Sequence, residues 1–590
     1  IGVHVGNFTS EWNRNVTLLA TGPNGEERPS FVGSIPPMSV RKIPVRLAAI
    51  SPDETGEMSF TLALIDPAAE EPIDERTVTL AVLEPEATRR VTFQSDVDGS
   101  VQFYGLTPAL VDPENRTWPG IILSLHGAGV DAKRQAACYR PKAFAHVVAP
   151  TNRRPYGFDW EDWGRLDAFE ALAHAQQTLS TDPRKQWLTG HSMGGHGAWQ
   201  LAVQRPHFFA AVGPSAGWRS FYTYGTDRLP VNDAIDEVLD RAAAASDTLL
   251  LKENLKRPSI FILHGDADDN VPVEEARAMR ELLRDHPDLV YHEQEGAGHW
   301  WGDECVDFAP MISFFNERVR AAGGLDTIDF TTIDPGMSSR SDWVEISAQQ
   351  TARMPSRVSG SRSPDTGVVD LHTENVEKLR LHLPSDVKWA YTIDGQRIRV
   401  GARSALLSRG APASFLLLNG RWKNVAGFSL QLKNPRRNGS FKDAFRNGMV
   451  FVVGTTGTAE ETALNTSKAI FDAEQFLYRG NGSPEVIRDS GFDVDRYNGR
   501  NVILYGNAET NGAWDTMLGD SPVTIDRSGI SIGKERIEGD DLALLMIRPQ
   551  RNHRWSSVGV VAGTGVKGMR LTEQLPYFVA GVHYPDLTVI

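Results

Sequence analysis

The chain has 590 residues, of which 41% are apolar and 23% charged, and its formal net charge is −14. This length exceeds what one hydrophobic core holds and predicts roughly three or four domains. The acidic balance argues against nucleic acid or an anionic membrane as the main partner, and the apolar runs are far shorter than the ~20 residues of a membrane span.

Two features concern the compartment. The chain begins at Ile1 rather than at methionine, which favours a removed leader and a secreted or periplasmic location. It has only two cysteines, Cys138 and Cys305, which excludes a disulfide framework. The sequence leaves open whether these two form a single disulfide or remain thiols. We expect no metal and no cofactor, because no cluster of histidine, cysteine and carboxylate residues has metal-ligand spacing.

Residues 1–93 have an all-β pattern. Short alternating segments at 40–47 and 59–64 are separated by proline, glycine and aspartate turns. This pattern predicts a small N-terminal β-sandwich.

Residues 94–323 alternate between strands and helices, which predicts an α/β domain with a mostly parallel sheet. A helical insertion rich in alanine and leucine spans 219–257, where a hydrolase often carries a cap. The remaining predicted elements are strands at 120–125, 145–149, 259–263 and 289–293 and helices at 165–179 and 307–321.

The last two regions are predicted as accessory domains. Residues 324–430 are β-rich, with strands at 343–346 and 414–418, and the Ser/Arg-rich stretch 353–367 reads as a loop or linker. Residues 431–590 return to an α/β pattern, with strands at 449–453, 501–505 and 558–561, each followed by a glycine-containing turn.

The run from Gly190 to Gly194 has the form G-x-S-x-G after an apolar strand and before a glycine-rich helix. A serine hydroxyl becomes a useful nucleophile when it is exposed on such a turn and partnered by a base. Ser192 is therefore the candidate nucleophile. A second copy surrounds Ser215, but Pro214 precedes that serine and no small-residue helix follows it. We therefore favour Ser192.

The partners of such a serine follow in the order acid, then histidine. His264-Gly265-Asp266-Ala267-Asp268 comes after a strand, and Asp268 is the predicted acid, with Asp269 as the alternative. His299 follows Gly298 after the next strand and is the predicted general base.

The remaining site residues are predicted from their place near strand ends. The turn His126-Gly127-Ala128-Gly129 resembles the glycine-rich turn that supplies an oxyanion hole. The backbone N–H groups of Ala128 and Met193 are the predicted donors. The tentative walls of the substrate pocket are Trp160, His196, Trp218 and Trp300.

Together these motifs make residues 118–320 resemble the prolyl-oligopeptidase-like branch of the α/β-hydrolases, which also includes secreted feruloyl-esterase-like enzymes. The resemblance implies an α/β-hydrolase catalytic domain and a Ser-His-Asp triad. Only 93 residues precede this domain here, and they have no propeller blade repeat. We therefore expect a carboxylesterase acting on a small-molecule or polymeric ester. A serine peptidase is the alternative, and a catalytically inactive binding protein is a third reading that the complete motif set disfavours. The oligomeric state is not predicted.

Overall fold

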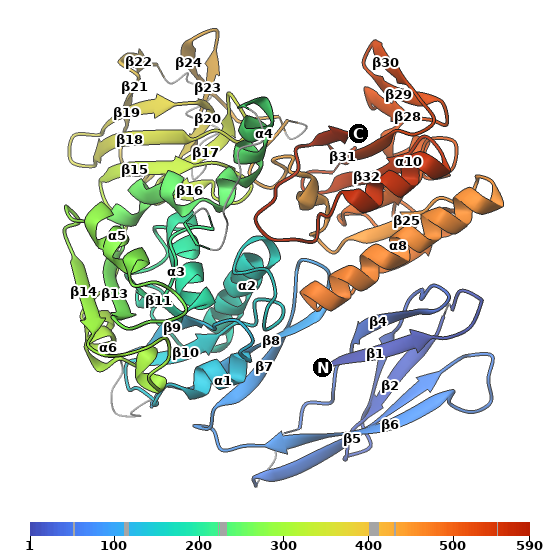
Figure 1. The fold of residues 1–590 in the computed structure, drawn as a ribbon, viewed down its shortest axis with the longest axis horizontal. Coiled ribbons are helices and arrows are strands. Elements are labelled where there is room, and N and C mark those ends of the chain that lie inside the picture. The colour runs from blue at the N-terminus through green and yellow to red at the C-terminus, as the bar shows by residue number, and fades with distance from the viewer. Residues whose placement is uncertain are drawn as a thin grey trace. The chain divides into compact units, whose positions relative to one another are not determined.

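The computed structural model describes residues 1–13, 15–50, 54–110, 117–221, 223–224, 233–399, 412–429, 432–551 and 553–590, and the side chains of 233–235 are outside this description. The chain divides into two compact units (Figure 1). Unit 1 comprises residues 1–104, 439–579 and 584–590, and unit 2 comprises 105–438 and 580–583. The predicted boundary between residues 430 and 431 lies outside the described residues.

A parallel sheet forms the centre of unit 2, with strand order β14-β13-β12-β11-β9-β10-β8. Its strands run parallel except β8, which is antiparallel to β10. Strands β9 to β12 are buried on both faces, as expected of strands covered by helices. The strands are β8 (Val101–Thr107, entering from unit 1), β9 (Gly120–Leu125), β10 (Ala145–Ala149), β11 (Gln186–His191), β12 (Ala211–Ser215), β13 (Ser259–Gly265) and β14 (Leu289–Gln294).

Helices cover this sheet and confirm its α/β character. Met311 and Phe315 of α6 pack with Trp187 and Phe261 in one buried cluster, while α3 contacts β9, β11 and β12. Helix α2 begins at Asp162, three residues earlier than predicted, and α6 ends at Asn316 rather than near 321. The helices are α1 (Ala132–Ala137), α2 (Asp162–Thr178), α3 (Met193–Gln204), α4 (Asp233–Ala243), α5 (Glu274–Leu282) and α6 (Ala309–Asn316), with 3₁₀ turns at Ala244–Ser246, Thr248–Lys256 and Asp303–Cys305.

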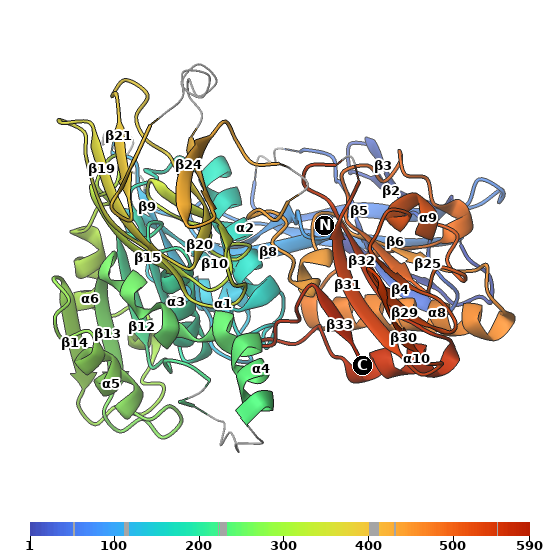
Figure 2. The same cartoon turned by 90° about the horizontal axis from the view of Figure 1, so that it is seen from above.

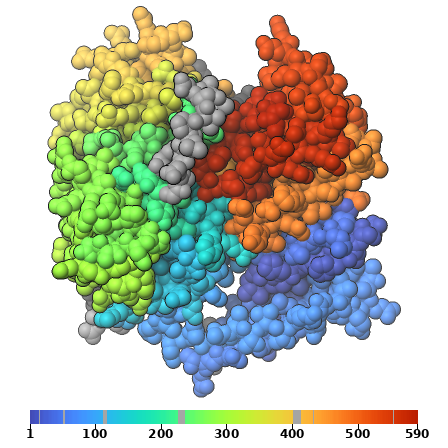
Figure 3. All heavy atoms as spheres, in the orientation of Figure 1, coloured from blue at the N-terminus to red at the C-terminus, as the bar shows by residue number. Residues whose placement is uncertain are grey.

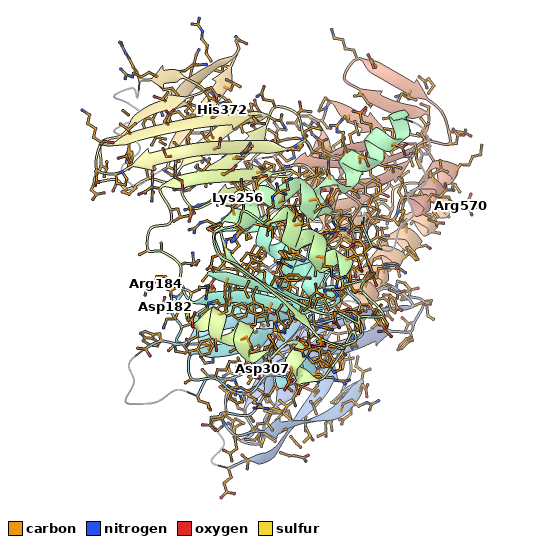
Figure 4. The ribbon with its side chains drawn as sticks, turned by 60° about the vertical axis from the view of Figure 1, so that its left-hand side comes forward. Asp182, Arg184, Lys256, Asp307, His372 and Arg570 are labelled. Atoms are coloured by element: carbon orange, nitrogen blue, oxygen red, sulfur yellow. The ribbon has the colours of Figure 1, made fainter. Side chains whose placement is uncertain are left out.

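Asp182, Arg184 and Asp307, three of the residues labelled in Figure 4, form ion pairs in the connections around this sheet. Arg184 Nη2 lies 2.9 Å from Asp182 Oδ2 in the loop that leads into β11. Asp307 lies before α6, and its Oδ1 is 2.6 Å from Lys142 Nζ. The first pair is at the end of β11 opposite Ser192, and its Arg184 side chain is exposed to solvent.

The β-rich part of unit 2 consists of two sheets around one core that includes Phe330, Trp343 and Phe415. The sheets have orders β15-β18-β19-β21-β22 and β16-β17-β20-β23-β24 and are seen from above in Figure 2. Their strands are β15 (Thr327–Thr332), β16 (Arg340–Ser341), β17 (Val344–Gln349), β18 (Ser356–Ser363), β19 (Val368–Glu374), β20 (Val376–Leu381), β21 (Ala390–Ile393), β22 (Gln396–Ile398), β23 (Ala413–Leu418) and β24 (Arg421–Val425).

The predicted loop at 353–367 is wrong. Residues Ser356–Ser363 form β18, which pairs with β15 on one side and β19 on the other. The hydrogen bonds of two neighbouring strands override the low β propensity of a Ser/Arg-rich segment. Val358 and Arg362 point inward, and Arg362 Nε donates to Asp326.

The N-terminal part of unit 1 contains a two-stranded sheet, β1-β4, and a four-stranded sheet, β3-β2-β5-β6. Val5, Leu18, Ile43 and Leu62 belong to the core cluster of this region. The strands are β1 (Gly2–Asn7), β2 (Thr17–Thr21), β3 (Glu27–Phe31), β4 (Ser39–Pro44), β5 (Gly56–Ile65), β6 (Asp74–Val82) and β7 (Arg89–Gln94), and β7 follows β8 in the order of the large sheet.

The C-terminal part of unit 1 has a sheet of order β26-β25-β27-β32-β31-β33, in which β25, β26, β27 and β32 are parallel. Helix α8 contacts both β25 and β4, and Figure 3 shows it at the surface between the blue and red parts of this unit. The elements are β25 (Val450–Val453), α8 (Ala459–Gly480), β26 (Glu485–Arg488), β27 (Val502–Tyr505), α9 (Trp514–Leu518), β28 (Val523–Ile525), β29 (Gly529–Ile532), β30 (Glu535–Glu538), β31 (Ala543–Pro549), β32 (Ser557–Gly563), α10 (Val566–Leu571) and β33 (Leu587–Val589), with 3₁₀ turns at Phe441–Ala444, Asp489–Gly491 and Thr572–Gln574.

The first and last parts of unit 1 are joined by buried polar contacts. Lys42 Nζ donates to the carbonyl oxygen of Asn481, and the Ser483 amide donates to Asp98 Oδ2 at 2.7 Å. Across the described residues, no helix is long and apolar enough to cross a membrane.

Candidate active site

Ser192 occupies the turn between β11 and α3 with φ 59° and ψ −120°, a backbone conformation that is costly for a residue with a side chain. The flanking glycines make this turn feasible. A Cβ on Gly190 would lie 2.2 Å from the Gly194 carbonyl oxygen, and one on Gly194 would lie 2.0 Å from the Leu125 carbonyl oxygen. The chain therefore holds Ser192 in a strained turn at the carboxyl end of a central strand, as in a nucleophile elbow.

Asp268 and His299 come together from two loops at the same end of the sheet. His299 Nδ1 lies 2.8 Å from Asp268 Oδ2 and 3.0 Å from Oδ1. The His299 side chain is 18% exposed and that of Asp268 is fully buried. Within the described residues no hydrogen bond joins Ser192 Oγ to His299, and such bonds often tighten only when substrate is bound.

Several donors converge on the Asp268 carboxylate. The amides of Asn270 and Val271 donate to Oδ1 at 2.9 Å, and His264 Nε2 lies 3.2 Å from Oδ2. Burial alone raises the pKa of Asp268, but the hydrogen bonds from His264, His299 and the two amides outweigh it and lower that pKa below its usual range. Asp268 is therefore held as a carboxylate, able to orient His299. Asp269, the alternative acid, is exposed.

The second G-x-S-x-G copy has another role. Ser215 is fully buried at the end of β12, and its hydroxyl donates to the carbonyl oxygen of Cys305 at 2.8 Å. His191 Nδ1 lies 3.1 Å from the same hydroxyl, and the ring of His191 packs 4.8 Å from that of His299. Burial, then the charge of His299, lowers the pKa of His191 to about 3, so His191 is neutral. Ser215 thus supports the histidine beside the candidate base.

The turn after β9 lies against Ser192. A Cβ on Gly127 would stand 3.5 Å from Ser192 Cβ. The Gly129 amide donates to the Pro155 carbonyl oxygen at 3.0 Å. By contrast, the amides of Ala128 and Met193 have no acceptor among the described residues. Met193 begins a helix, where amides lack an intrahelical partner. Both predicted oxyanion donors therefore remain available.

The four predicted pocket residues separate into two kinds. Trp160, His196 and Trp218 are buried, with exposures of 0%, 0% and 6%. The rings of His196 and Trp218 stack with centroids 4.9 Å apart. Trp300 is 50% exposed and its ring packs 5.2 Å from His191, so it alone of the four presents a face to solvent near the candidate base.

In the segment 151–161 between β10 and α2, sequence reasoning singled out Trp160 but missed Tyr156 and Glu161. Tyr156 is exposed, and its hydroxyl would lie 3.0 Å from a Cβ on Gly129, next to the predicted oxyanion turn. Glu161 is buried beside His196. No motif marks either residue, because their contacts lie far along the chain.

The two cysteines are both free thiols. Cys305 Sγ accepts a hydrogen bond from the Trp301 amide at 3.1 Å, and burial is the main cause that raises the pKa of each thiol to about 12. Among the described residues, no group of three or more histidine, cysteine or carboxylate side chains is placed to hold a metal ion.

One family model matches part of the chain. Residues 153–321 match the prolyl oligopeptidase family. An uncharacterized secreted protein of Arthroderma benhamiae is 24% identical over 518 residues, covering 80% of this chain and 53% of that protein. The chain therefore spans about half the length of this curated relative.

Similar solved structures include an S-formylglutathione hydrolase of Staphylococcus aureus (17% identity, 39% of this chain and 98% of that one, TM-score 0.32). A ferulic acid esterase of Anaeromyces mucronatus is similar at 16% identity (40% and 92%, TM-score 0.29). A puromycin-hydrolyzing peptidase of Mycobacterium tuberculosis is similar at 14% identity (51% and 53%, TM-score 0.33). With its parallel sheet and strained serine turn, unit 2 has an α/β-hydrolase-like fold, and its residues 153–321 match the prolyl oligopeptidase family of serine hydrolases.

Proposed function

We propose that this protein is a serine carboxylesterase that works through an acyl-enzyme. Ser192 is the nucleophile, His299 the general base and Asp268 the residue that orients His299. The observation that carries the proposal is the hydrogen bond from His299 Nδ1 to Asp268 Oδ2, 2.8 Å long, at the same end of the sheet as the strained Ser192 turn. In such a site the base and its orienting acid are what activate a serine hydroxyl.

The reaction proceeds in two acyl transfers. Ser192 Oγ attacks the ester carbonyl while His299 Nε2 takes its proton, and the oxyanion accepts hydrogen bonds from the amides of Ala128 and Met193. The C–O bond to the alcohol then breaks, and His299 returns the proton to the departing alkoxide. Water attacks the acyl-enzyme with His299 again as base, releasing the carboxylic acid and free Ser192.

A serine peptidase is the second candidate, because the family that residues 153–321 match is named for oligopeptidases. The ester reading is favoured by the described residues before β7, where β1 to β6 form a two-stranded and a four-stranded sheet rather than repeated propeller blades. The same machinery cleaves either bond, so the substrate decides between the two functions.

The test compares p-nitrophenyl acyl esters with chromogenic peptide amides. We expect turnover of the esters, fluorophosphonate labelling of the wild-type protein, and loss of both in Ser192→Ala. Ser215→Ala is the matched control and should keep its label. Rapid amide turnover with negligible ester turnover would favour the peptidase instead.

The finer organisation is also part of the proposal. We infer that residues 1–93 are a β-sandwich, that 324–430 and 431–590 are accessory domains, and that Trp300, the exposed one of the four predicted pocket residues, contacts a small-molecule or polymeric ester, whereas the buried Trp160, His196 and Trp218 do not line the pocket. A secreted location is supported by the secreted relative of Arthroderma benhamiae.

A further inference from the structure

The loop from Thr151 to Asp162 is held in a strained conformation. It contains a cluster of residues with positive φ, a backbone conformation that is unfavourable for a residue with a side chain. Asn152 is buried, and its side-chain oxygen accepts hydrogen bonds from the amides of Phe158 (3.2 Å) and Trp160 (3.1 Å). These bonds hold the backbone of the loop in this conformation. The φ values are 54° at Asn152, 66° at Arg153, 29° at Gly157, 52° at Asp159, 63° at Trp160 and 40° at Asp162.

This loop holds both ends of the predicted oxyanion turn. Trp160 Nε1 donates to the carbonyl oxygen of His126 at 3.2 Å, at the start of the turn. The Pro155 carbonyl accepts from the amide of Gly129 at 3.0 Å, at its end. The candidate donor Ala128 lies between these two anchors, so the position of the loop sets the position of its N–H.

The same loop is fastened to α3, the helix that begins immediately after Ser192. A Cβ on Gly197 would lie 2.4 Å from the Trp160 indole, so the ring packs directly on the helix backbone. Glu161 Oε1 lies 3.6 Å from His196 Nε2, one helical turn after the serine. Both side chains are buried, at 2% and 0% exposed, and Ser246 Oγ donates to the other Glu161 oxygen at 2.6 Å.

The hydrogen bonds of His196 indicate where its protons lie. His196 Nδ1 is 3.2 Å from the Trp218 carbonyl oxygen, and a carbonyl only accepts, so Nδ1 carries a hydrogen. In a neutral ring, Nε2 would then turn its lone pair toward the Glu161 carboxylate. A second proton on Nε2 removes this repulsion and pairs two buried charges.

Other ionisable groups surround the pair. Asp159, on the same loop, has its pKa raised to about 6 by burial and then by the charge of Glu161. From the segment 580–583 of unit 2, His583 Nδ1 lies 3.6 Å from Asp162 Oδ1, and its Nε2 lies 3.5 Å from Ser246 Oγ.

We propose that Glu161 and His196 are positioning residues, which carry opposite charges as a buried ion pair and thereby hold loop 151–162, and with it the oxyanion turn, against Ser192. The inference rests on the proposed function, because it assigns the loop a role in the reactivity of that serine. It concerns only chain contacts and needs no knowledge of the substrate.

The test measures kcat and KM on a p-nitrophenyl ester and, independently, the rate of fluorophosphonate labelling. His196→Leu and Glu161→Leu should each lower kcat and the labelling rate about 10–100-fold with KM changed less than about twofold, because displaced transition-state groups cost up to ~100-fold. The double variant should be no worse than the worse single one. His196→Gln keeps an N–H toward Glu161 and should recover most of the rate. His382→Leu is the matched control: it breaks a His–Glu pair of 2.9 Å with Glu345 and should change neither rate.

A second measurement does not depend on how the leucine variants fold. In ¹⁵N-histidine-labelled wild-type protein, both ring nitrogens of His196, assigned by their loss in His196→Gln, should have imidazolium shifts at neutral pH. A neutral ring overturns the ion pair. Wild-type labelling rates in the folded leucine variants overturn the positioning role while leaving the proposed function intact, whereas a wild-type protein that does not label at all refutes the function itself.

Discussion

His264 Nε2 lies 3.2 Å from Asp268 Oδ2, the same oxygen that His299 Nδ1 approaches at 2.8 Å. One carboxylate therefore contacts two histidines, of which only His299 is partly exposed. His264 Nε2 also lies 2.9 Å from the Val271 carbonyl oxygen, which fixes its N–H toward the Asp268 loop. The orientation of the candidate base thus depends on a buried histidine behind it.

Replacing His264 tests this dependence. We expect His264→Leu to lower kcat about 10-fold on an ester substrate, with little change in KM, because misorienting a catalytic group weakens mainly the transition state. Steady-state kinetics measures the effect. A raised KM with an unchanged kcat would argue against a role for His264 in orienting Asp268 and His299.

The depressed pKa of Asp268 gives a stability prediction. Its folded pKa lies below its unfolded value near 3.8, so its ionised form stabilises the fold above that value, and this contribution is lost as the pH falls through the folded pKa. The Asp268→Asn variant has no carboxylate at this position and therefore lacks this pH-dependent contribution to stability. Urea unfolding should show the wild-type advantage over Asp268→Asn shrinking below about pH 4. An advantage that grows toward low pH would contradict the direction of this shift.

Activity should also depend on pH through His299. A protonated imidazole cannot accept the Ser192 proton, so kcat/KM should fall as the pH is lowered from about 8 to about 4. Buffers of matched ionic strength provide the measurement. A flat profile over this range would exclude His299 as the base.

Gly197 provides a packing prediction. A methyl group there would meet the buried indole of Trp160 at 2.4 Å, and neither the helix backbone nor the packed ring has room to move. We expect Gly197→Ala to destabilise the protein by about 1–3 kcal/mol and to slow fluorophosphonate labelling. Gly491→Ala is the control, since nothing lies within 4 Å of the position that its new methyl group would take. Equal melting temperatures for the two variants would refute this packing account.

We expect both cysteine thiols to react slowly with alkylating reagents. Because the pKa of each thiol is raised to about 12, little thiolate exists at neutral pH. Iodoacetamide at pH 7 should modify the folded protein slowly, and reductant should change neither its mass nor its activity. A mass 2 Da lower before reduction would indicate a disulfide instead.

Local patterns predicted much of unit 2. The strand at 120–125 coincides with β9 and that at 145–149 with β10, since buried parallel strands are continuous apolar runs. The turn at Ser192 was found because its glycines are adjacent in sequence. The pairing of Asp268 with His299 followed from their order after two strands, and their assignment as members of a triad stays a prediction.

What the sequence did not reveal depends on contacts between distant residues. Trp160 adopts a left-handed backbone conformation that no local signal favours in a tryptophan, and it does so because it packs on Gly197 and bonds to His126. Glu161 has no local signal of a role, and only the folded chain brings His196 beside it. Strand β18 was missed because its partners, not its composition, make it a strand.

The two-part composition of unit 1 has a consequence for biosynthesis. Its N-terminal strands leave the ribosome first, yet contacts such as Lys42 with Asn481 and Asp98 with Ser483 require residues made after residues 105–438 of unit 2. At roughly 5–20 residues per second, that interval lasts tens of seconds. During it, the N-terminal sheets lack their contacts with residues 439–579, while most of the hydrolase-like unit is already free to fold, so a chain truncated in this interval would carry the serine-bearing sheet without the C-terminal part of unit 1.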